Sequence, residues 1–299
     1  MKEFTRREVL KTGLAGAGLV LGAPLLPPAS AGTKTKFHAY DRIELANTGV
    51  KVSRLAMGTG VKGGNRSSRL KRKGQEAFNA VIRHGLDRGL NFIDLADWYG
   101  THEMARKALK GIARDKYVLL TKLWTRNTPG FHPSGGAEKE IHQFLKELAT
   151  DYIDVCLIHY ITYPDYIKRH QRVRDELARL KEKGIVRAVG ISCHHYGALQ
   201  IAAKDPWVDV IFARINYMGG WEYKMDGPAE LIANVLKMAR KNGKAVVGMK
   251  IFAEGKLVKP EQKDKSFSFV LRNGLTDAMT IGMMTPQEID DCMQRIEKV

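Results

Sequence analysis

Short apolar runs alternate with amphipathic segments along most of the chain. The amphipathic segments repeat their apolar residues at helical spacing, as Ile141, Phe144 and Leu148 do. The last of them opens with Thr285-Pro286-Gln287-Glu288, a capping-box arrangement that predicts the start of a helix. The apolar runs have the length and composition of buried strands. Eight runs occur, at 55–59, 91–94, 117–122, 153–158, 186–192, 208–215, 245–250 and 278–282.

Strands that alternate with helices predict a parallel sheet with helices packed outside it. Eight such units favour closure into a (β/α)8 TIM barrel. An alternating segment at 43–52, centred on Asn47-Thr48-Gly49, predicts a β-hairpin ahead of the barrel. An open doubly wound sheet is the alternative. However, Gly58-Thr59-Gly60 continues as Val61-Lys62-Gly63 after the first strand, which does not match the dinucleotide fingerprint.

The first 31 residues have the pattern of an export signal. The pair Arg6-Arg7 precedes an apolar, Gly/Ala-rich stretch at 12–26, and Ala29-Ser30-Ala31 fits a cleavage site. A merely amphipathic N-terminus is the alternative interpretation. We therefore expect a twin-arginine signal peptide at 1–31 and one barrel domain at 32–299. The twin-arginine export machinery would be a partner, and the protein would be periplasmic after cleavage near Ala31.

Composition and charge narrow the classes of protein to which the chain could belong. The formal net charge is +17, and it falls to +15 without residues 1–31. The densest basic cluster, from Arg66 to Lys73, has no interleaved aromatic residues, so we expect a solvated face and no nucleic-acid partner. No apolar run reaches the roughly 18–20 residues of a membrane helix, so we expect no stable membrane insertion of the mature protein. The widely spaced Cys156, Cys193 and Cys292 exclude an iron–sulfur domain.

Ionisable or polar residues stand where the apolar runs end. Any one of them could be a strand end that meets solvent. However, the C-terminal ends of barrel strands meet at one rim, where the active sites of such barrels lie. These residues are therefore candidates for a common site: Asp94, Lys122, His159, Ser192, Arg214 with Asn216, and Lys250.

Several of these ends carry motifs of the aldo-keto reductases. The stretch 92–100, FIDLADWYG, is similar to their D-x-A-x-x-Y-G motif. Thr121-Lys122-Leu123-Trp124 resembles their catalytic lysine strand, and 151–159 resembles the strand that ends on their histidine. Gly190-Ile191-Ser192 stands in the place of their nicotinamide-contacting turn. The resemblance covers about residues 43–296, in order.

The resemblance implies an oxidoreductase with a catalytic tetrad of Asp94, Tyr99, Lys122 and His159. Such an enzyme moves a hydride between a nicotinamide dinucleotide and a small-molecule carbonyl or alcohol. Tyr99 would donate the proton, and because its ordinary pKa is near 10, we expect Lys122 to lower that pKa. Asp94 would keep Lys122 charged and oriented, and His159 would donate a hydrogen bond to the substrate oxygen.

The nicotinamide contacts depart from the family pattern. Ser192-Cys193 stand where the family has a serine and an asparagine, and Arg214 takes the place of its glutamine. Met249 or Lys250 stands where a tyrosine often stacks on the nicotinamide. The resemblance therefore places these residues at the cofactor but implies that it is held differently or weakly.

The phosphate end also departs from the pattern of relatives that prefer NADPH. Gly282 and Met283 align with the Lys-Ser pair that holds the 2′-phosphate, and Glu288 lies near the position of an arginine. A carboxylate there repels a phosphate, whereas a helix N-terminus attracts one. We expect the cofactor to be NADP(H) or NAD(H), with weak discrimination. Since the chain stops where the eighth helix ends, without the family's C-terminal tail, we also expect a more open pocket.

Other residues near the predicted rim are weaker candidates. Trp98 and Tyr160 are candidates to line the substrate pocket. His194-His195 lack a third ligand, so no metal is predicted. Lys256 and Lys259 either clamp the pyrophosphate or belong to a solvated loop.

An alternative function is an exported barrel that binds a dinucleotide or a partner with little or no turnover. The altered nicotinamide contacts favour it, and the complete tetrad argues against it. A lyase or isomerase that uses Lys122 is disfavoured by the Tyr99 motif.

Overall fold

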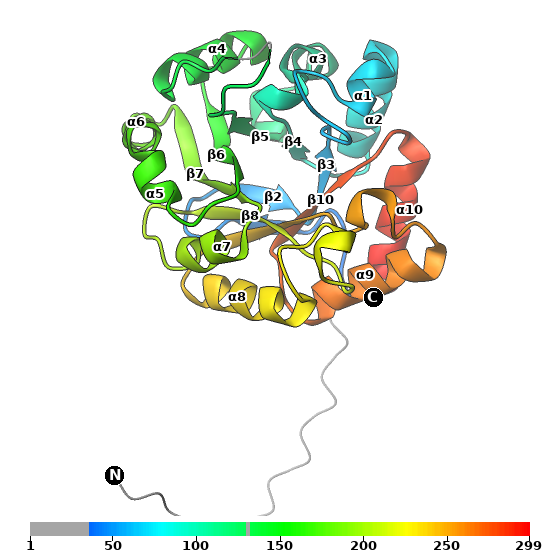
Figure 1. Cartoon of the computed structure of the whole chain (residues 1–299). Helices are drawn as coiled ribbons and strands as arrows, with labels where there is room; N and C mark the ends of the chain where they lie inside the picture. Colours follow the sequence, from blue (N-terminus) through cyan, green and yellow to red (C-terminus); the bar gives the residue numbers. More distant parts are fainter. Residues whose placement is uncertain (1–35, 130–131) are drawn as a thin grey trace, which may run out of the picture. The chain divides into compact units, whose positions relative to one another are not determined.

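The computed structural model describes residues 36–129 and 132–299, and eight parallel strands in this part of the chain close into a barrel (Figure 1). Each predicted apolar run overlaps one of these strands. The predicted (β/α)8 TIM barrel is therefore confirmed. In order around the barrel, the strands are β10 (Ala278–Gly282), β3 (Leu55–Gly58), β4 (Phe92–Asp94), β5 (Val118–Leu123), β6 (Ile153–Ile161), β7 (Val186–Cys193), β8 (Val210–Arg214) and β9 (Ala245–Met249).

Helices surround the barrel in the connections between successive strands (Figure 1). The predicted last helix begins where expected, because the Thr285 side chain accepts a hydrogen bond from the backbone N–H of Glu288. The helices are α1 (Arg69–Arg72), α2 (Gln75–Asp87), α3 (His102–Ala108), α4 (Glu138–Leu148), α5 (Tyr166–Arg169), α6 (Gln171–Glu182), α7 (Tyr196–Ala202), α8 (Ala229–Lys241), α9 (Pro260–Arg272) and α10 (Pro286–Glu297). Short 3₁₀ turns are η1 (Asp97–Tyr99), η2 (Arg114–Lys116), η3 (Trp221–Tyr223) and η4 (Ala253–Gly255).

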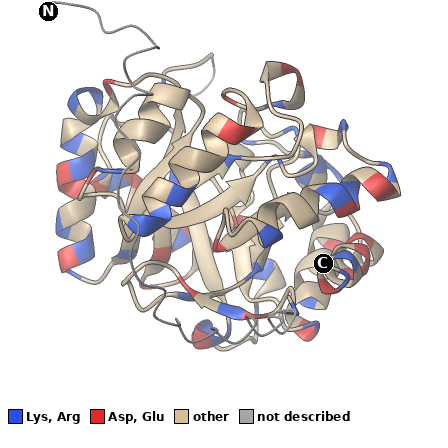
Figure 2. Ribbon diagram, turned by 90° about the horizontal axis from the view of Figure 1, so that it is seen from below, with Lys and Arg blue, Asp and Glu red and all other residues tan. Residues whose placement is uncertain are grey.

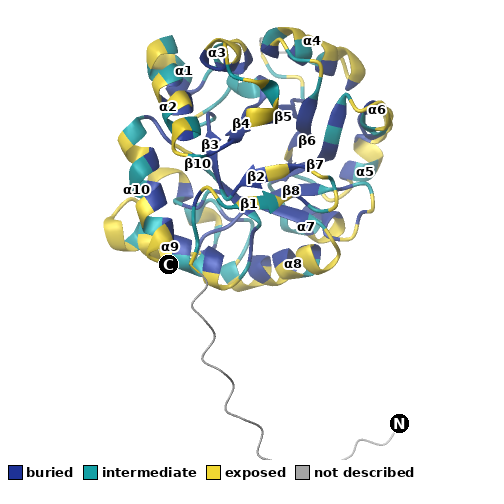
Figure 3. Cartoon of the chain, turned by 180° about the vertical axis from the view of Figure 1, so that it is seen from behind, coloured by how far each residue is buried: buried dark blue, intermediate teal, exposed yellow. Residues whose placement is uncertain are grey.

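Two apolar cores follow from the alternation of side chains along each strand. On β6, Val155 and Leu157 belong to the core inside the barrel, whereas Cys156 and Ile158 belong to the core between the barrel and its helices. Figure 3 shows the strands buried and the outer faces of the helices exposed. The strands therefore read as continuous apolar runs because both of their faces are covered.

The predicted β-hairpin is present and closes one end of the barrel. Strand β1 (Arg42–Glu44) pairs antiparallel with β2 (Lys51–Ser53). Leu45, Val50 and Val52 from this hairpin are fully buried and belong to the core inside the barrel. Viewed from behind, the hairpin lies across the barrel opening (Figure 3). Because it covers the N-terminal ends of the strands, the C-terminal rim is left for a site.

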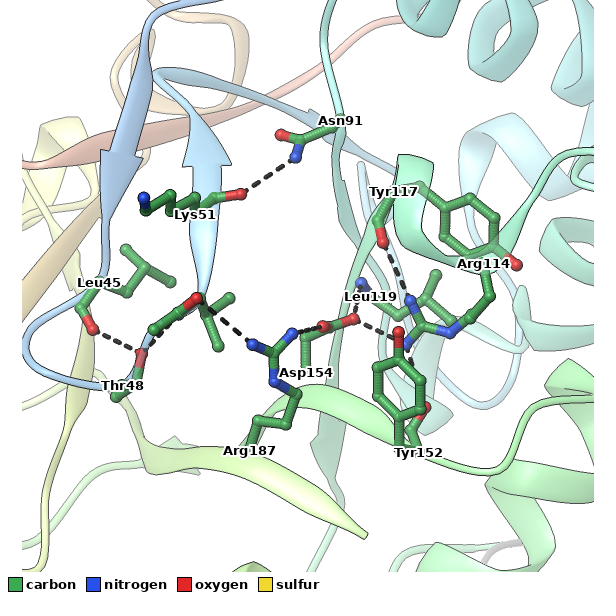
Figure 4. Close-up of polar contacts among 12 residues, drawn as sticks. Leu45, Thr48, Lys51, Asn91, Arg114, Tyr117, Leu119, Tyr152, Asp154 and Arg187 are labelled. Atoms are coloured by element: carbon green, nitrogen blue, oxygen red, sulfur yellow. Dashed lines mark hydrogen bonds and ion pairs between the residues drawn. The ribbon is translucent and has the colours of Figure 1, made fainter. Parts of the chain in front are cut away.

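Asp154 is the centre of a polar network at the hairpin end of the barrel (Figure 4). Its carboxylate accepts from Arg114 at 2.7 Å, from Arg187 at 2.9 Å and from the backbone N–H of Leu119 at 2.9 Å. Arg187 also donates to the carbonyl oxygen of Gly49 in the hairpin turn, at 3.3 Å. One buried carboxylate thus links β5, β6 and β7 to the hairpin.

Charges of both signs are spread over the outer helices, with acidic residues among the basic ones (Figure 2). The basic cluster from Arg66 to Lys73 is not only a solvated face. Arg66 pairs with the buried carboxylate of Asp97 at 2.8 Å, and the Lys71 ammonium donates to the carbonyl oxygen of Arg66 at 2.9 Å. Within the described residues, no helix is long and apolar enough to cross a membrane. The predicted signal peptide at 1–31 lies outside the described residues.

Candidate active site

Asp94 and Lys122 form a buried ion pair at the rim opposite the hairpin. The Lys122 ammonium is 1% exposed and donates to Oδ1 of Asp94 and, at 2.9 Å, to the carbonyl oxygen of Leu95. The Thr280 hydroxyl donates to Oδ2 of Asp94 at 2.8 Å. Burial lowers the pKa of Lys122, and Asp94 opposes that shift. Asp94 thus orients Lys122 and favours its charged form, as expected.

The turn η1 carries Tyr99 over this ion pair. Lys122 Nζ lies 4.9 Å from the centre of the Tyr99 ring, and the ring meets that of His159 edge-on at 5.5 Å. The loop that follows β3 covers the tyrosine, since a Cβ atom at Gly60 or Gly63 would overlap its ring. The structure therefore brings the four residues of the predicted tetrad together.

The pKa of Tyr99 does not follow the expectation from its neighbour. It is raised well above its ordinary value, first by burial and then by the negative charges of Asp94 and Glu254. This direction is opposite to the lowering expected from Lys122, because burial and the two carboxylates disfavour the phenolate form. Burial of Tyr99 thus favours its protonated form.

An irregularity in β6 shapes the position of His159. The register of β6 against β7 shifts between Ile158 and Ile161, and Tyr160 has a φ of 58°, in the left-handed region. Such bulges redirect side chains and occur beside active sites. The ring of His159 meets Tyr99, while that of Tyr160 lies 4.5 Å from the ring of His194.

The environment of His159 disfavours its charged form. Burial lowers its pKa well below the ordinary value, and the charges of Lys122 and His194 add to the effect. Its Nδ1 is buried and has no hydrogen-bond partner within the described part of the chain. A neutral imidazole carries one N–H group, which suits the expected role as a hydrogen-bond donor to the substrate oxygen.

Aromatic rings form a wall beside His159. Trp98 stacks on Trp124 at 4.0 Å, Trp124 meets His159 edge-on at 5.4 Å, and Tyr160 lies 5.8 Å from Trp124. The two predicted pocket residues, Trp98 and Tyr160, therefore meet through Trp124, which the sequence reasoning missed. A signal for Trp124 exists in the sequence, because it stands two positions after Lys122 at the same strand end.

The two cationic candidates for the cofactor already have carboxylate partners. Arg214 bonds Asp226 with two of its nitrogens, one at 3.0 Å, and lies under the ring of Trp221 at 5.2 Å. Lys250 pairs with Glu254. The sequence did not indicate that Asp226 and Glu254 pair with these cations. Both carboxylates follow their strands in irregular segments, and a periodic pattern cannot predict their positions. Both cations nevertheless lie at the same rim as the tetrad.

Ser192 and Cys193 are neighbours on β7, and their side chains point to opposite faces of the strand. Ser192 is buried, and its hydroxyl lies 3.4 Å from Nε2 of His194. Cys193 belongs instead to the core between barrel and helices, where its thiol donates to the carbonyl oxygen of His195. Strand alternation turns the Cys193 side chain away from the barrel interior, so its side chain does not point toward the predicted cofactor position. Met249 lies in the core inside the barrel.

The phosphate end of the predicted cofactor site is filled by the chain itself. A Cβ atom at Gly282 would overlap Val61, so the loop after β3 packs directly on this glycine. The carboxylate of Glu288 accepts the backbone N–H of Met284 at 2.5 Å. At the N-terminus of α10, where an anionic ligand would be favoured, the protein thus places its own carboxylate.

The remaining candidates have local structural roles. His195 caps α7 by accepting from the backbone N–H of Ala198. Lys259 is the N-cap residue of α9, and the Lys256 ammonium lies 5.9 Å from the centre of the Tyr223 ring. Among the residues that the structure describes, no group of His, Cys, Asp or Glu could hold a metal ion.

The family model of the aldo/keto reductases matches residues 54–294, and this chain belongs to that family. Aldo-keto reductase YhdN of Bacillus subtilis is 33% identical over 156 residues, which cover 50% of this chain and 45% of that protein. Methylglyoxal reductase DkgA of Yersinia pestis is 36% identical over 129 residues, covering 42% and 43%. The matched stretches thus span less than half the length of these two relatives.

Solved structures of aldo-keto reductases share the fold. One from Bacillus halodurans has a TM-score of 0.67 and 19% identity, covering 86% of this chain and 90% of its own. One from Klebsiella pneumoniae, solved in complex with NADPH, has a TM-score of 0.64 and 16% identity, covering 86% and 89%.

Proposed function

We propose that this chain is an NAD(P)-dependent oxidoreductase that transfers a hydride between a nicotinamide dinucleotide and a small-molecule carbonyl or alcohol. The observation that carries the proposal is the meeting of Asp94, Lys122, Tyr99 and His159 at one rim. Family membership supports it. So do the relatives named for reducing methylglyoxal, which include an NADH-specific reductase of Escherichia coli.

The described residues fit a nicotinamide at the rim. Ser192 on β7 is a buried polar side chain, and the buried Nδ1 of His159 on β6 has no hydrogen-bond partner among the described residues. Arg214 and Lys250 would lie near the cofactor and contribute positive charge. When bound, the reduced nicotinamide supplies the hydride that adds to the carbonyl carbon.

The tetrad then handles the oxygen and its proton. The Tyr99 hydroxyl donates its proton to the carbonyl oxygen as that oxygen takes up the electron pair of the C=O double bond. The Lys122 ammonium, held by Asp94, stabilises the phenolate that Tyr99 becomes, and water returns the proton. Neutral His159 donates a hydrogen bond to the same oxygen.

The direct test is the consumption of reduced dinucleotide by the purified protein with a reactive aldehyde. Turnover with NADH or NADPH is the expected result. A second candidate function is the binding of a dinucleotide or a partner with little or no turnover, which the altered nicotinamide contacts favour. Tight dinucleotide binding without turnover on a broad aldehyde panel would favour that candidate and contradict ours.

We further propose that the protein binds both dinucleotides with weak discrimination, because Glu288 stands where a 2′-phosphate would lie. Glu288→Arg is expected to tighten NADPH binding about tenfold, or about 1.4 kcal/mol, and to leave NADH nearly unchanged. The gain is limited because Glu288 is exposed and solvent screens its charge. Dissociation constants for both cofactors, measured by fluorescence titration of wild type and variant, test this.

Glu261→Arg provides a matched control, because it makes the same charge change in the first turn of the neighbouring helix α9. It should change neither constant. A wild-type preference for NADPH above about 100-fold, near 2.7 kcal/mol, would show that the phosphate site lies elsewhere.

We also propose that residues 1–31 are a twin-arginine signal peptide, that residues 32–299 form the exported domain, and that the mature protein is periplasmic. The support is the order of Arg6-Arg7, the apolar stretch and Ala29-Ser30-Ala31. Changing both arginines to lysine is expected to abolish export while preserving charge, because the pathway recognises the arginine pair. Cell fractionation and mass spectrometry of the exported protein test this, and an exported protein with residues 1–31 intact would contradict the cleavage site.

A further inference from the structure

Arg126 lies on the rim of the active site, just beyond the end of β5 and two residues after Trp124. Its Nη2 donates to the carbonyl oxygen of Tyr160 at 3.0 Å and to the hydroxyl of Thr162. Its Nη1 and Nε have no acceptor among the described residues, and the side chain is only partly buried. The guanidinium therefore keeps N–H donors for a ligand.

Arg126 differs in this respect from the other cations of the rim. Lys122, Arg214 and Lys250 each pair with a carboxylate, from Asp94, Asp226 and Glu254 respectively. No carboxylate within the described part of the chain forms an ion pair with Arg126. Its guanidinium carbon instead lies near two tyrosine rings, 5.4 Å from the centre of Tyr163 and closer to Tyr160.

The aromatic wall connects Arg126 to the reacting centre. The guanidinium carbon lies 4.8 Å from the centre of the Tyr160 ring, and Tyr160 stacks near Trp124 with an angle of 26° between the rings. Trp124 in turn meets His159. Trp124 is buried against Trp98, whereas Tyr160 is 36% exposed. A flat substrate that lies along Tyr160, with its carbonyl toward His159, would place its far end near Arg126.

We propose that Arg126 binds a carboxylate on the substrate, and that the preferred substrates are aromatic or conjugated carbonyl compounds with a carboxylate at the end opposite the carbonyl. This inference rests on the proposed oxidoreductase function and specifies its substrate class. A carboxylate suits the free donors, since charge-assisted hydrogen bonds between guanidinium and carboxylate are short and strong. The exposed ring of Tyr160 supplies apolar surface for the substrate ring.

The test compares 4-carboxybenzaldehyde with its methyl ester, which has the same ring and aldehyde but no charge. Arg126→Met is expected to raise KM for the acid about tenfold and to leave kcat and the ester KM within about twofold. Arg126→Lys should restore part of the acid preference, since it keeps the charge. Lys237→Met, which removes an exposed cation from the outer side of α8, is the control for overall charge.

An equal loss for acid and ester in Arg126→Met would overturn the proposal. It would show that Arg126 acts only by holding the backbone of Tyr160. Binding of terephthalate, a dicarboxylate that is not reduced, is measured by calorimetry as a readout independent of turnover. A third outcome separates the two proposals: wild type reduces neither aldehyde, but terephthalate binding weakens about tenfold in Arg126→Met. This result would support the carboxylate subsite and contradict the proposed oxidoreductase function. Terephthalate binding that is equal in both proteins overturns the subsite.

Discussion

Replacing Tyr99 with phenylalanine is expected to lower the turnover of a reactive aldehyde by about 10²-fold or more. The substitution removes the hydroxyl that carries the transferable proton and keeps the ring. The ring contacts with Gly60, Gly63 and His159 are thus preserved, so the fold should not change. Steady-state kinetics measure the loss, and circular dichroism with thermal melting checks the fold.

Tyr160→Phe is the matched control for this substitution. It removes a tyrosine hydroxyl from the same rim, where Tyr160 contributes its ring to the aromatic wall. We expect a smaller loss of turnover than in Tyr99→Phe, because this substitution keeps the ring of a predicted pocket residue and removes no hydroxyl of the tetrad. Wild-type turnover in Tyr99→Phe would contradict the assignment of the proton donor. An equal loss in both variants would point to a general disturbance of the rim.

The positions of the tetrad were predictable because they depend on local patterns. A strand that is buried on both faces gives an apolar run, and the residue at the end of that run lies at the rim of a parallel barrel. Asp94 and His159 follow from that rule alone. Tyr99 needed the motif, since it lies in a turn whose place relative to the strands has no periodic signal.

The charge state of the site was not predictable in the same way. Whether Lys122 lowers the pKa of Tyr99 depends on three-dimensional distances and on the balancing charge of Asp94. The partner of Arg214 is Asp226, twelve residues further along the chain in an irregular loop. Sequence periodicity cannot indicate which carboxylate neutralises which cation.

Side-chain direction separates Ser192 from Cys193. The resemblance placed both at the nicotinamide, but a strand sends successive side chains to opposite faces. That alternation, applied to β7, already predicts that the Cys193 side chain faces away from the barrel interior. The packing of Val61 on Gly282, by contrast, depends on the path of an irregular loop and had no signal in the sequence.

Away from the site, the network around Asp154 is expected to contribute more to stability than any exposed ion pair. Asp154 is 1% exposed and accepts three hydrogen bonds, two of them from guanidinium groups. Arg114 gives further bonds to the carbonyl oxygens of Tyr117 and Tyr152 and lies over the Tyr152 ring at 3.9 Å (Figure 4). Removing the carboxylate would leave two neighbouring cations and a buried N–H without their acceptor.

Asp154→Ala is therefore expected to lower the free energy of unfolding by about 3 kcal/mol, the lower end of the range for breaking a buried ion pair. The lower end applies because the side chains of Arg114 and Arg187 are 20% and 39% exposed, so water compensates part of the loss. For a domain of this size, that loss corresponds to a fall in Tm on the order of 10 °C. Asp115→Ala is the control, since its carboxylate is 74% exposed and lies 3.7 Å from Lys116. The control should stay within about 0.5 kcal/mol of wild type. Denaturant unfolding and thermal melting of both variants measure the difference, and equal stabilities would show that the hairpin end is held by its apolar core alone.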